Sequence, residues 1–73
     1  MSADNGYILR KRAADNQFVL QMYFASNDSY PSINDDRAMT FDNVEEALAK
    51  YEEIDREYYS SEYGLTVQID QPV

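Results

Sequence analysis

Residues 43–59 read NVEEALAKYEEIDREYY, and this stretch decides the fold because it carries the clearest helical period in the chain. Its apolar side chains recur every three or four positions, which is typical of a helix that buries one face. At 100° per residue they fall within an arc of about 120°. The stripe consists of Val44, Ala47, Leu48, Tyr51, Ile54 and Tyr58. Asn43 and Glu46 have the spacing of a capping box, so we expect the helix to begin directly after Asn43.

One carboxylate, Asp55, lies at the edge of this stripe near the predicted C-terminal end of the helix. A carboxylate is unfavourable there because of the helix dipole and because charged groups are rarely buried unpaired. We expect Asp55 either to pair with Arg10, Lys11 or a tyrosine hydroxyl at the margin of the core, or to line a small pocket between helix and sheet.

A hairpin of two strands is expected before the helix. Residues 7–12 and 17–25 show alternating apolar positions, and residues 13–16 connect them. If Arg12 pairs with Gln17, then Leu9 faces Leu20 on an apolar side of the sheet, while the other side is mixed. This pattern predicts a sheet that is covered on one face only.

Residues 26–39 read SNDSYPSINDDRAM and are rich in the side chains that satisfy their own backbone in turns. A loop of this length in a small domain is usually functional or disordered, so it is the first place to look for a binding site. Its end, residues 39–41, either adds a short strand to the sheet or only fills space in the core with its side chains.

The chain after the helix predicts one more strand, residues 65–69, with Leu65, Val67 and Ile69 directed inward. Gly64 precedes it and can take the left-handed conformation that the exit from the helix needs. A strand, helix, strand crossover makes the flanking strands parallel. We therefore predict one α+β domain over residues 1–73, a ββαβ two-layer fold whose three-stranded antiparallel/mixed sheet has the order 2-1-3 and carries the helix across one face.

The composition excludes several classes of function. The 73 residues include no Cys and no His, so the chain has neither a thiolate metal site nor the commonest general base. A nucleophile elbow and a glycine-rich phosphate loop are also missing. We therefore expect a protein that is not an enzyme and that needs no cofactor and no metal. The oxygen ligands within residues 27–36 lack the spacing of a calcium loop, and we interpret them as turn residues.

The net charge of −8 is unevenly placed, since residues 28–62 contain eleven acidic and three basic side chains. Such a field disfavours nucleic acid and anionic membranes and favours a basic protein partner. No apolar run is long enough to span a membrane, and the N-terminus lacks the order of a signal peptide, so we expect a cytoplasmic protein.

Three surfaces are candidates for protein binding: the acidic side of the helix, the loop 26–39 and the open face of the sheet. Seven tyrosines support this interpretation, because exposed tyrosines are common in protein interfaces. The predicted protein-binding residues are Tyr23, Tyr30, Asp35, Asp36, Glu52, Glu53 and Glu57.

Three segments, MSADNGYILRK, FASND and the run from TFDNVEEALAKYEEI to EYGL, resemble small acidic accessory proteins of actinobacteriophages. The likeness spans most of the chain and involves overall pattern rather than a functional motif. It implies expression in the host bacterial cytoplasm and an unidentified host protein as partner. Small acidic phage proteins often look like inhibitors of a host enzyme or defence system, so we predict a non-enzymatic accessory protein that acts by protein–protein binding.

The sequence leaves other functions open. Self-assembly as a homodimer or minor virion protein would use Ile8, Val19 and Tyr23 on the open face of the sheet. DNA mimicry would use glutamates two helical turns apart, such as Glu45 and Glu52, at a spacing of about 10 Å. Capture of a small ligand or a metal would use the loop 26–39.

Overall fold

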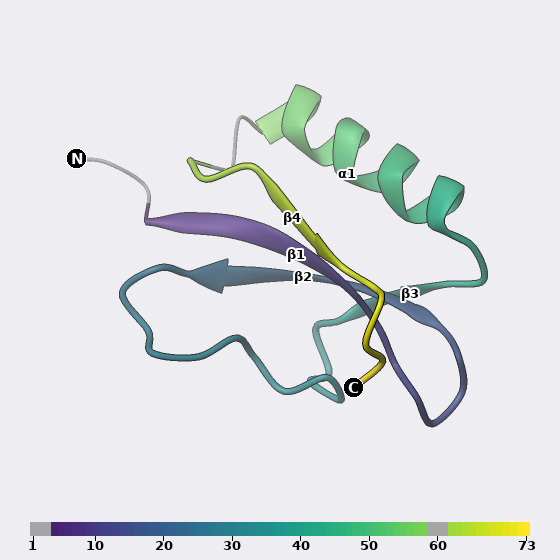
Figure 1. Ribbon diagram of the computed structural model, residues 1–73. Coiled ribbons are helices and arrows are strands. Elements are labelled where there is room, and N and C mark those ends of the chain that lie inside the picture. The colour runs from purple at the N-terminus through teal and green to yellow at the C-terminus, as the bar shows by residue number, and fades with distance from the viewer. Residues whose placement is uncertain (1–3, 59–61) are drawn as a thin grey trace.

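The computed structural model describes residues 4–58 and 62–73, and it shows one helix on a mixed four-stranded sheet. The elements are β1 (Asn5–Lys11), β2 (Phe18–Phe24), β3 (Met39–Phe41), α1 (Val44–Tyr58) and β4 (Leu65–Gln68). The strand order is β3-β2-β1-β4, and α1 and the loop between β2 and β3 lie on opposite sides of the sheet (Figure 1). The prediction of an α+β fold is confirmed.

The sheet has one strand more than the three that the sequence predicts. The order 2-1-3 holds for β2, β1 and β4, and β4 runs parallel to β1 as expected. The additional strand is β3, which pairs antiparallel with β2 through Phe18 with Phe41 and Leu20 with Met39. Three residues are too few to show the alternation that identifies a strand. The sequence pattern alone therefore cannot distinguish a strand from a segment that only fills the core here.

The predicted hairpin register is confirmed, because Leu9 faces Leu20 across β1 and β2. The turn closes where Arg12 N–H donates to Gln17 O at 2.8 Å. Asn16 takes a φ of 58°, a left-handed conformation that asparagine tolerates better than most residues. Gly64 has a φ of 71°, as expected for the residue that leads into β4.

The start of α1 follows the predicted capping box, since Asn43 Oδ1 accepts a hydrogen bond from Glu46 N–H at 2.9 Å. Ala47 and Ile54 are buried, and they form the core of the domain with Tyr7, Leu9 and Leu20. Val44 and Tyr51 of α1 pack against this cluster. Leu65 of the edge strand β4 and Ile69, which follows that strand, also pack against it. One face of the sheet is therefore closed by apolar packing.

Three predictions at the margin of this core are wrong. Leu48 is 37% exposed and Val67 is 49% exposed, although both were expected to point inward. The reason is that α1 packs mainly on β2 and β3, so it leaves β4 less covered. Asp55 is exposed to solvent, so it neither pairs at the core margin nor lines a pocket. The side chain of Tyr58 and all of Tyr59 lie outside the described residues.

The second face of the sheet is covered, contrary to the prediction of a sheet covered on one face only. Ile8 and Val19, expected on an open face, are both 0% exposed. Residues 25–38, which we call the covering loop, lie against this face (Figure 1). The surface on which self-assembly through Ile8 and Val19 would depend is therefore not available.

Candidate functional site

Three side chains, two from the sheet and one from the hairpin turn, hold the covering loop by its backbone. Their donors meet three successive carbonyls: Arg10 Nη2 donates to Pro31 O at 2.7 Å, Gln21 Nε2 to Ser32 O at 2.6 Å, and Arg12 Nη1 to Ile33 O at 3.3 Å. We call Arg10, Arg12 and Gln21 the polar clamp. Because each bond goes to the main chain, the clamp fixes the path of residues 31–33 whatever their side chains do.

Arg10 lies at the centre of the polar clamp. It is 8% exposed, and its Nη2 also donates to Gln21 Oε1 at 2.6 Å. Its Cζ is 5.6 Å from the centroid of the Tyr30 ring, which packs edge-on against Tyr23 at 5.1 Å. Burial lowers the pKa of Arg10 from its ordinary value, and the neighbouring Tyr30 opposes this effect. The guanidinium is thus held by neutral oxygens and an aromatic face.

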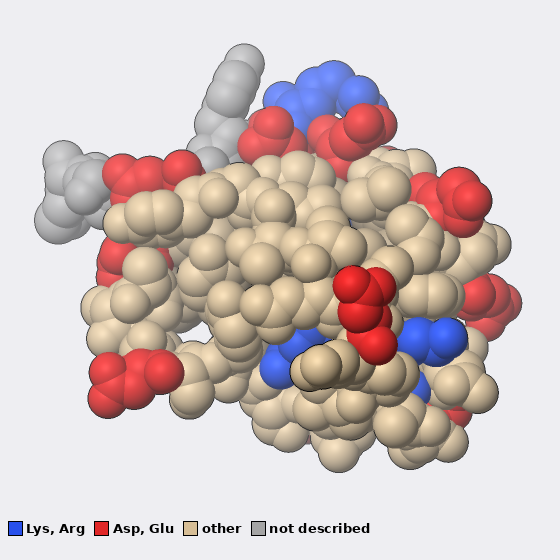
Figure 2. All heavy atoms as spheres, viewed as in Figure 1, with Lys and Arg blue, Asp and Glu red and all other residues tan. Residues whose placement is uncertain are grey.

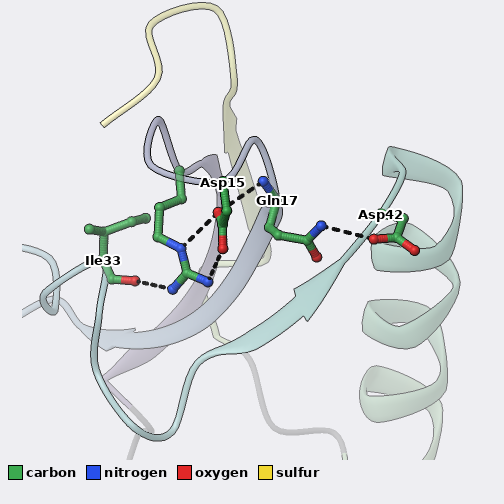
Figure 3. Close-up of polar contacts among 5 residues, drawn as sticks. Asp15, Gln17, Ile33 and Asp42 are labelled. Atoms are coloured by element: carbon green, nitrogen blue, oxygen red, sulfur yellow. Dashed lines mark hydrogen bonds and ion pairs between the residues drawn. The ribbon is translucent and has the colours of Figure 1, made fainter.

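The hairpin turn extends this polar network to the helix. Arg12 forms an ion pair with Asp15, with 2.8 Å between Nη2 and Oδ2, beside its bond to Ile33 O (Figure 3). Asp15 Oδ1 also accepts from Gln17 N–H at 3.2 Å, and Gln17 Nε2 donates to Asp42 Oδ1 at 2.8 Å (Figure 3). The bond from Arg12 is the main reason why the pKa of Asp15 lies below its ordinary range. The covering loop and the start of α1 are therefore tied to the same turn.

A cavity of about 460 Å³ lies beside the C-terminal half of β2, and we call it the edge slot. It is lined by residues 21–24 of β2, by Asn27, Ser29, Tyr30 and Pro31 of the covering loop, and by Tyr7, Asp35, Arg37, Ala38 and Met39. Successive residues of a strand point to opposite faces, so a cavity lined by both Met22 and Tyr23 lies at the edge of the strand. Figure 2 shows the molecule hollowed on the side where Figure 1 places the covering loop.

The turn before β3 creates the space for the edge slot. Ala38 N–H donates to Asp35 O at 3.0 Å, and Asp35 Oδ1 accepts from Arg37 N–H at 2.9 Å. This second bond is that of an Asx-turn. An ion pair of 3.1 Å with Arg37 also holds the pKa of Asp35 below its ordinary range. Because the chain bends here, β3 begins only at Met39 and pairs with residues 18–20 of β2.

The edge slot brings together three of the seven predicted protein-binding residues, namely Tyr23, Tyr30 and Asp35. Asp36 belongs to the same turn as Asp35 and is exposed, but it does not line the cavity. Tyr23 also explains Gly6, its cross-strand partner, because a Cβ on Gly6 would lie 2.8 Å from Tyr23 Oη. The tyrosine ring therefore lies where a side chain of residue 6 would be.

The other three predicted residues, Glu52, Glu53 and Glu57, lie on α1 and do not line the edge slot. Glu53 accepts a hydrogen bond from Lys50 Nζ at 2.8 Å, which is the main reason why its pKa is lowered. Figure 2 shows acidic side chains scattered over the visible face and along its outline rather than gathered in one patch. The acidic side of α1 is therefore a second surface, separate from the slot.

The sequence prediction misses Met22, Phe24 and Arg37, which also line the edge slot. The alternation of β2 places Met22 and Phe24 on the same face as the core residue Leu20, yet they are 44% and 47% exposed. The signal that could have found them is the length of the segment 39–41, which is too short to cover the whole of β2.

Within residues 4–58 and 62–73, no three acidic side chains gather where they could hold a metal ion. Within the same described part of the chain, no helix is both long and apolar enough to cross a membrane.

Comparisons of the chain with protein-family models, with curated proteins and with solved structures found no match. The likeness to actinobacteriophage proteins therefore stays a prediction. Functional interpretation depends on the geometry of the edge slot and on the charge of the chain.

Proposed function

We propose that this chain acts by binding another protein through the edge slot, and that it catalyses no reaction. The observation that carries the proposal is the slot itself, a cavity of about 460 Å³ with one wall formed by β2 and another by the covering loop. Cavities of roughly 300–1,000 Å³ with mainly apolar walls are typical of small-molecule sites. What favours a protein as the occupant here is the set of large apolar side chains that stay exposed around the cavity. The polar clamp supports the proposal, because it fixes the loop wall in the absence of any partner.

The side chains around the edge slot are those that interfaces favour. Met22, Phe24 and Tyr30 are 44%, 47% and 38% exposed, and all three line the cavity. Aromatic residues and methionine are enriched in protein interfaces, and the largest losses of affinity on truncation come from such residues in pockets. Large apolar side chains that a small domain leaves exposed in one place are a reason to expect a partner there.

The charge of the chain sets the chemistry of the partner. A net charge of −8 on 73 residues attracts basic surfaces and speeds encounter with them at low salt. The specific form that we propose follows from the resemblance of the sequence to phage accessory proteins. In this form, the partner is a basic protein of the host bacterium, and the chain inhibits the partner by occupying its surface.

Site-specific photo-crosslinking in cells that express the chain tests the proposal. A benzophenone amino acid is placed at Tyr30, at the mouth of the edge slot, or at Glu52, on the exposed side of α1, as the matched control. We expect a cross-linked partner from Tyr30 and none from Glu52. Cross-links from Glu52 alone would show that the acidic helix is the interface, and a product of twice the mass of the chain would show self-association. No cross-link at either position would contradict protein binding altogether.

A further inference from the structure

We infer that the edge slot receives an extended segment of a basic partner as an added β-strand, paired with the backbone of β2 at residues 22–24. This inference rests on the proposed function and adds to it the binding mode and the chemistry of the segment bound. Strand addition to a free sheet edge draws its affinity from backbone hydrogen bonds and its specificity from pockets for alternate side chains.

The direction of the backbone groups in β2 follows from its pairing with β1. Arg12 N–H donates to Gln17 O and Ala25 N–H donates to Asp4 O, both at 2.8 Å. In an antiparallel pair the bonded residues alternate, so the odd-numbered residues of β2 exchange hydrogen bonds with β1. The N–H and C=O groups of the even-numbered residues therefore point to the opposite edge.

The C-terminal half of that opposite edge is free. β3 pairs with residues 18–20, and no strand among residues 4–58 and 62–73 pairs with Met22 or Phe24 on this side. The carbonyl of Phe24 accepts from Asn27 N–H at 3.0 Å in the turn that follows β2. Alternation thus directs the N–H and C=O of Met22 and the N–H of Phe24 toward the edge slot, as a short template for another strand.

The walls of the edge slot suit the side chains of such a strand. Met22 and Met39 lie on the side of the sheet that faces α1, whereas Tyr23 and Tyr30 lie on the side of the covering loop. A strand added between them would direct alternate side chains to the two sides. Each side offers an apolar or aromatic surface, so we expect apolar residues in the central part of the bound segment.

Charge decides between a foreign segment and a second copy of this chain. Two copies would each bring a net charge of −8 to the contact, and like charges oppose association. The charged lining of the slot itself is balanced, because Asp35 is ion-paired with Arg37. The negative field around the slot comes from the rest of the chain, including Asp28, which lines a smaller hollow that shares Tyr23, Phe24 and Tyr30 with it. A segment with Lys or Arg beside its apolar residues is therefore the occupant that the surroundings favour.

Selection from a displayed library of short random peptides tests this inference, with the wild-type chain and matched variants as baits. Met22→Pro removes an N–H that β1 does not use and places a ring in the path of an added strand. Met22→Ala removes the side chain but keeps that N–H, so the difference between the two variants measures the backbone contribution. Val67→Pro is the control at the other edge of the sheet. Tyr7 N–H donates to Gly64 O, and alternation along the parallel ladder then directs the N–H of Val67 away from β1.

We expect the selected peptides to combine Lys or Arg with apolar residues at alternate positions. We expect Met22→Pro to lose binding by about tenfold relative to Met22→Ala, as the loss of one hydrogen bond plus a steric clash implies. Val67→Pro should bind like the wild type. Peptides that bind Met22→Pro as tightly as Met22→Ala would overturn the inference, and so would a selection that enriches no peptide.

Amide hydrogen exchange of the wild type with the tightest selected peptide tests the same inference and does not depend on the folding of the proline variant. The peptide should slow exchange at Met22 and Phe24 and leave Leu65 and Val67 unchanged. Slowed exchange at Leu65 and Val67 alone would overturn the inference. Without peptide, exchange at Met22 that becomes slower as the protein concentration rises would also overturn it, because a second copy of the chain would then be the occupant. If Tyr30 still cross-links to a partner when these tests fail, the binding mode is wrong and the proposed function stands.

Discussion

The two faces of the sheet are closed in different ways. On one face α1 packs apolar side chains, Ala47 and Ile54, against Leu9 and Leu20. On the other face the covering loop is held by hydrogen bonds from the polar clamp to backbone carbonyls. The covering loop also buries Ile8 and Val19, so both faces contain packed apolar side chains, and the faces differ in that the loop alone is held by a set of side-chain bonds to its backbone. The edge slot lies where the two closures meet, at the edge of β2, and side chains from both faces line it.

The two closures also differ in energy. Burying a large aliphatic side chain contributes about 1.5–3 kcal/mol, whereas a hydrogen bond contributes about 0.5–1.5 kcal/mol net. Damage to the helix face should therefore unfold the whole domain. Damage to the loop face should mainly release the loop.

The largest effect is expected from Leu20→Ala, which opens a hole beneath α1. Leu20 is 0% exposed, so we expect a loss of about 2–5 kcal/mol in the free energy of unfolding. Denaturant titration followed by circular dichroism measures it. Leu48→Ala removes the same atoms from a side chain that is 37% exposed, and it should cost clearly less. Equal losses from the two variants would contradict the described packing of α1.

A smaller and more local effect is expected from Arg10→Met. This variant keeps much of the side-chain length but removes the donor to Pro31 O and Gln21 Oε1, which should cost about 1–3 kcal/mol. The covering loop should loosen first, so trypsin should cleave after Arg37 faster than in the wild type while the domain still unfolds cooperatively. Arg56→Met, on the exposed part of α1, is the control. Unchanged cleavage after Arg37 would show that the clamp does not hold the loop.

Gly6→Ala should have a still smaller effect. The new Cβ would lie 2.8–2.9 Å from the outer atoms of the Tyr23 ring, so the ring has to shift, which disturbs its edge-on contact with Tyr30. An aromatic pair of this kind is worth about 0.5–1.5 kcal/mol, and we expect a loss of that order. A double-mutant cycle with Tyr23→Leu measures the coupling between the two positions. If Gly6→Ala costs the same with and without the tyrosine ring, the ring is not what excludes a side chain at residue 6.

The smallest effect concerns the pH dependence of the turn before β3. The bond and ion pair with Arg37 hold the pKa of Asp35 below its ordinary range in the folded chain. A carboxylate whose pKa is lowered by folding favours the folded turn above its unfolded pKa, about 3.9, and this contribution is lost as the pH falls through the lower folded pKa. NMR titration should show the amide shifts of Arg37 and Ala38 changing below pH 4. Asp35→Asn should abolish that change, and its persistence in the variant would contradict the assignment.

The parts of the fold that sequence analysis finds are those with a periodic apolar signal. The helix cap at Asn43, the buried Ala47 and Ile54, and the pairing of Leu9 with Leu20 all follow from spacing. These features repeat along the chain, so each residue supports the interpretation of the next.

The covering loop gives no such signal, because the polar clamp binds backbone carbonyls that every residue possesses. Nothing in the side chains of Pro31 or Ser32 marks them as acceptors for Arg10 and Gln21. The edge slot is equally hidden, since it lies beside the half of β2 that β3 does not reach, and β3 begins only at Met39, after the Asx-turn at Asp35. Tyr23, Tyr30 and Asp35 are found among the candidates by residue type, whereas Met22 and Phe24 are missed because their alternation resembles that of the core.

Amide hydrogen exchange of the free protein tests the central claim most directly, because the edge slot requires an unpaired half of β2. Gln21 and Tyr23 direct their amides to β1, whereas Met22 and Phe24 direct theirs to the slot. We predict an alternating pattern along β2, with slow exchange at Gln21 and Tyr23 and much faster exchange at Met22 and Phe24. Exchange at Met22 and Phe24 as slow as at Gln21 and Tyr23 would contradict the account, because it would show that another segment already occupies the edge.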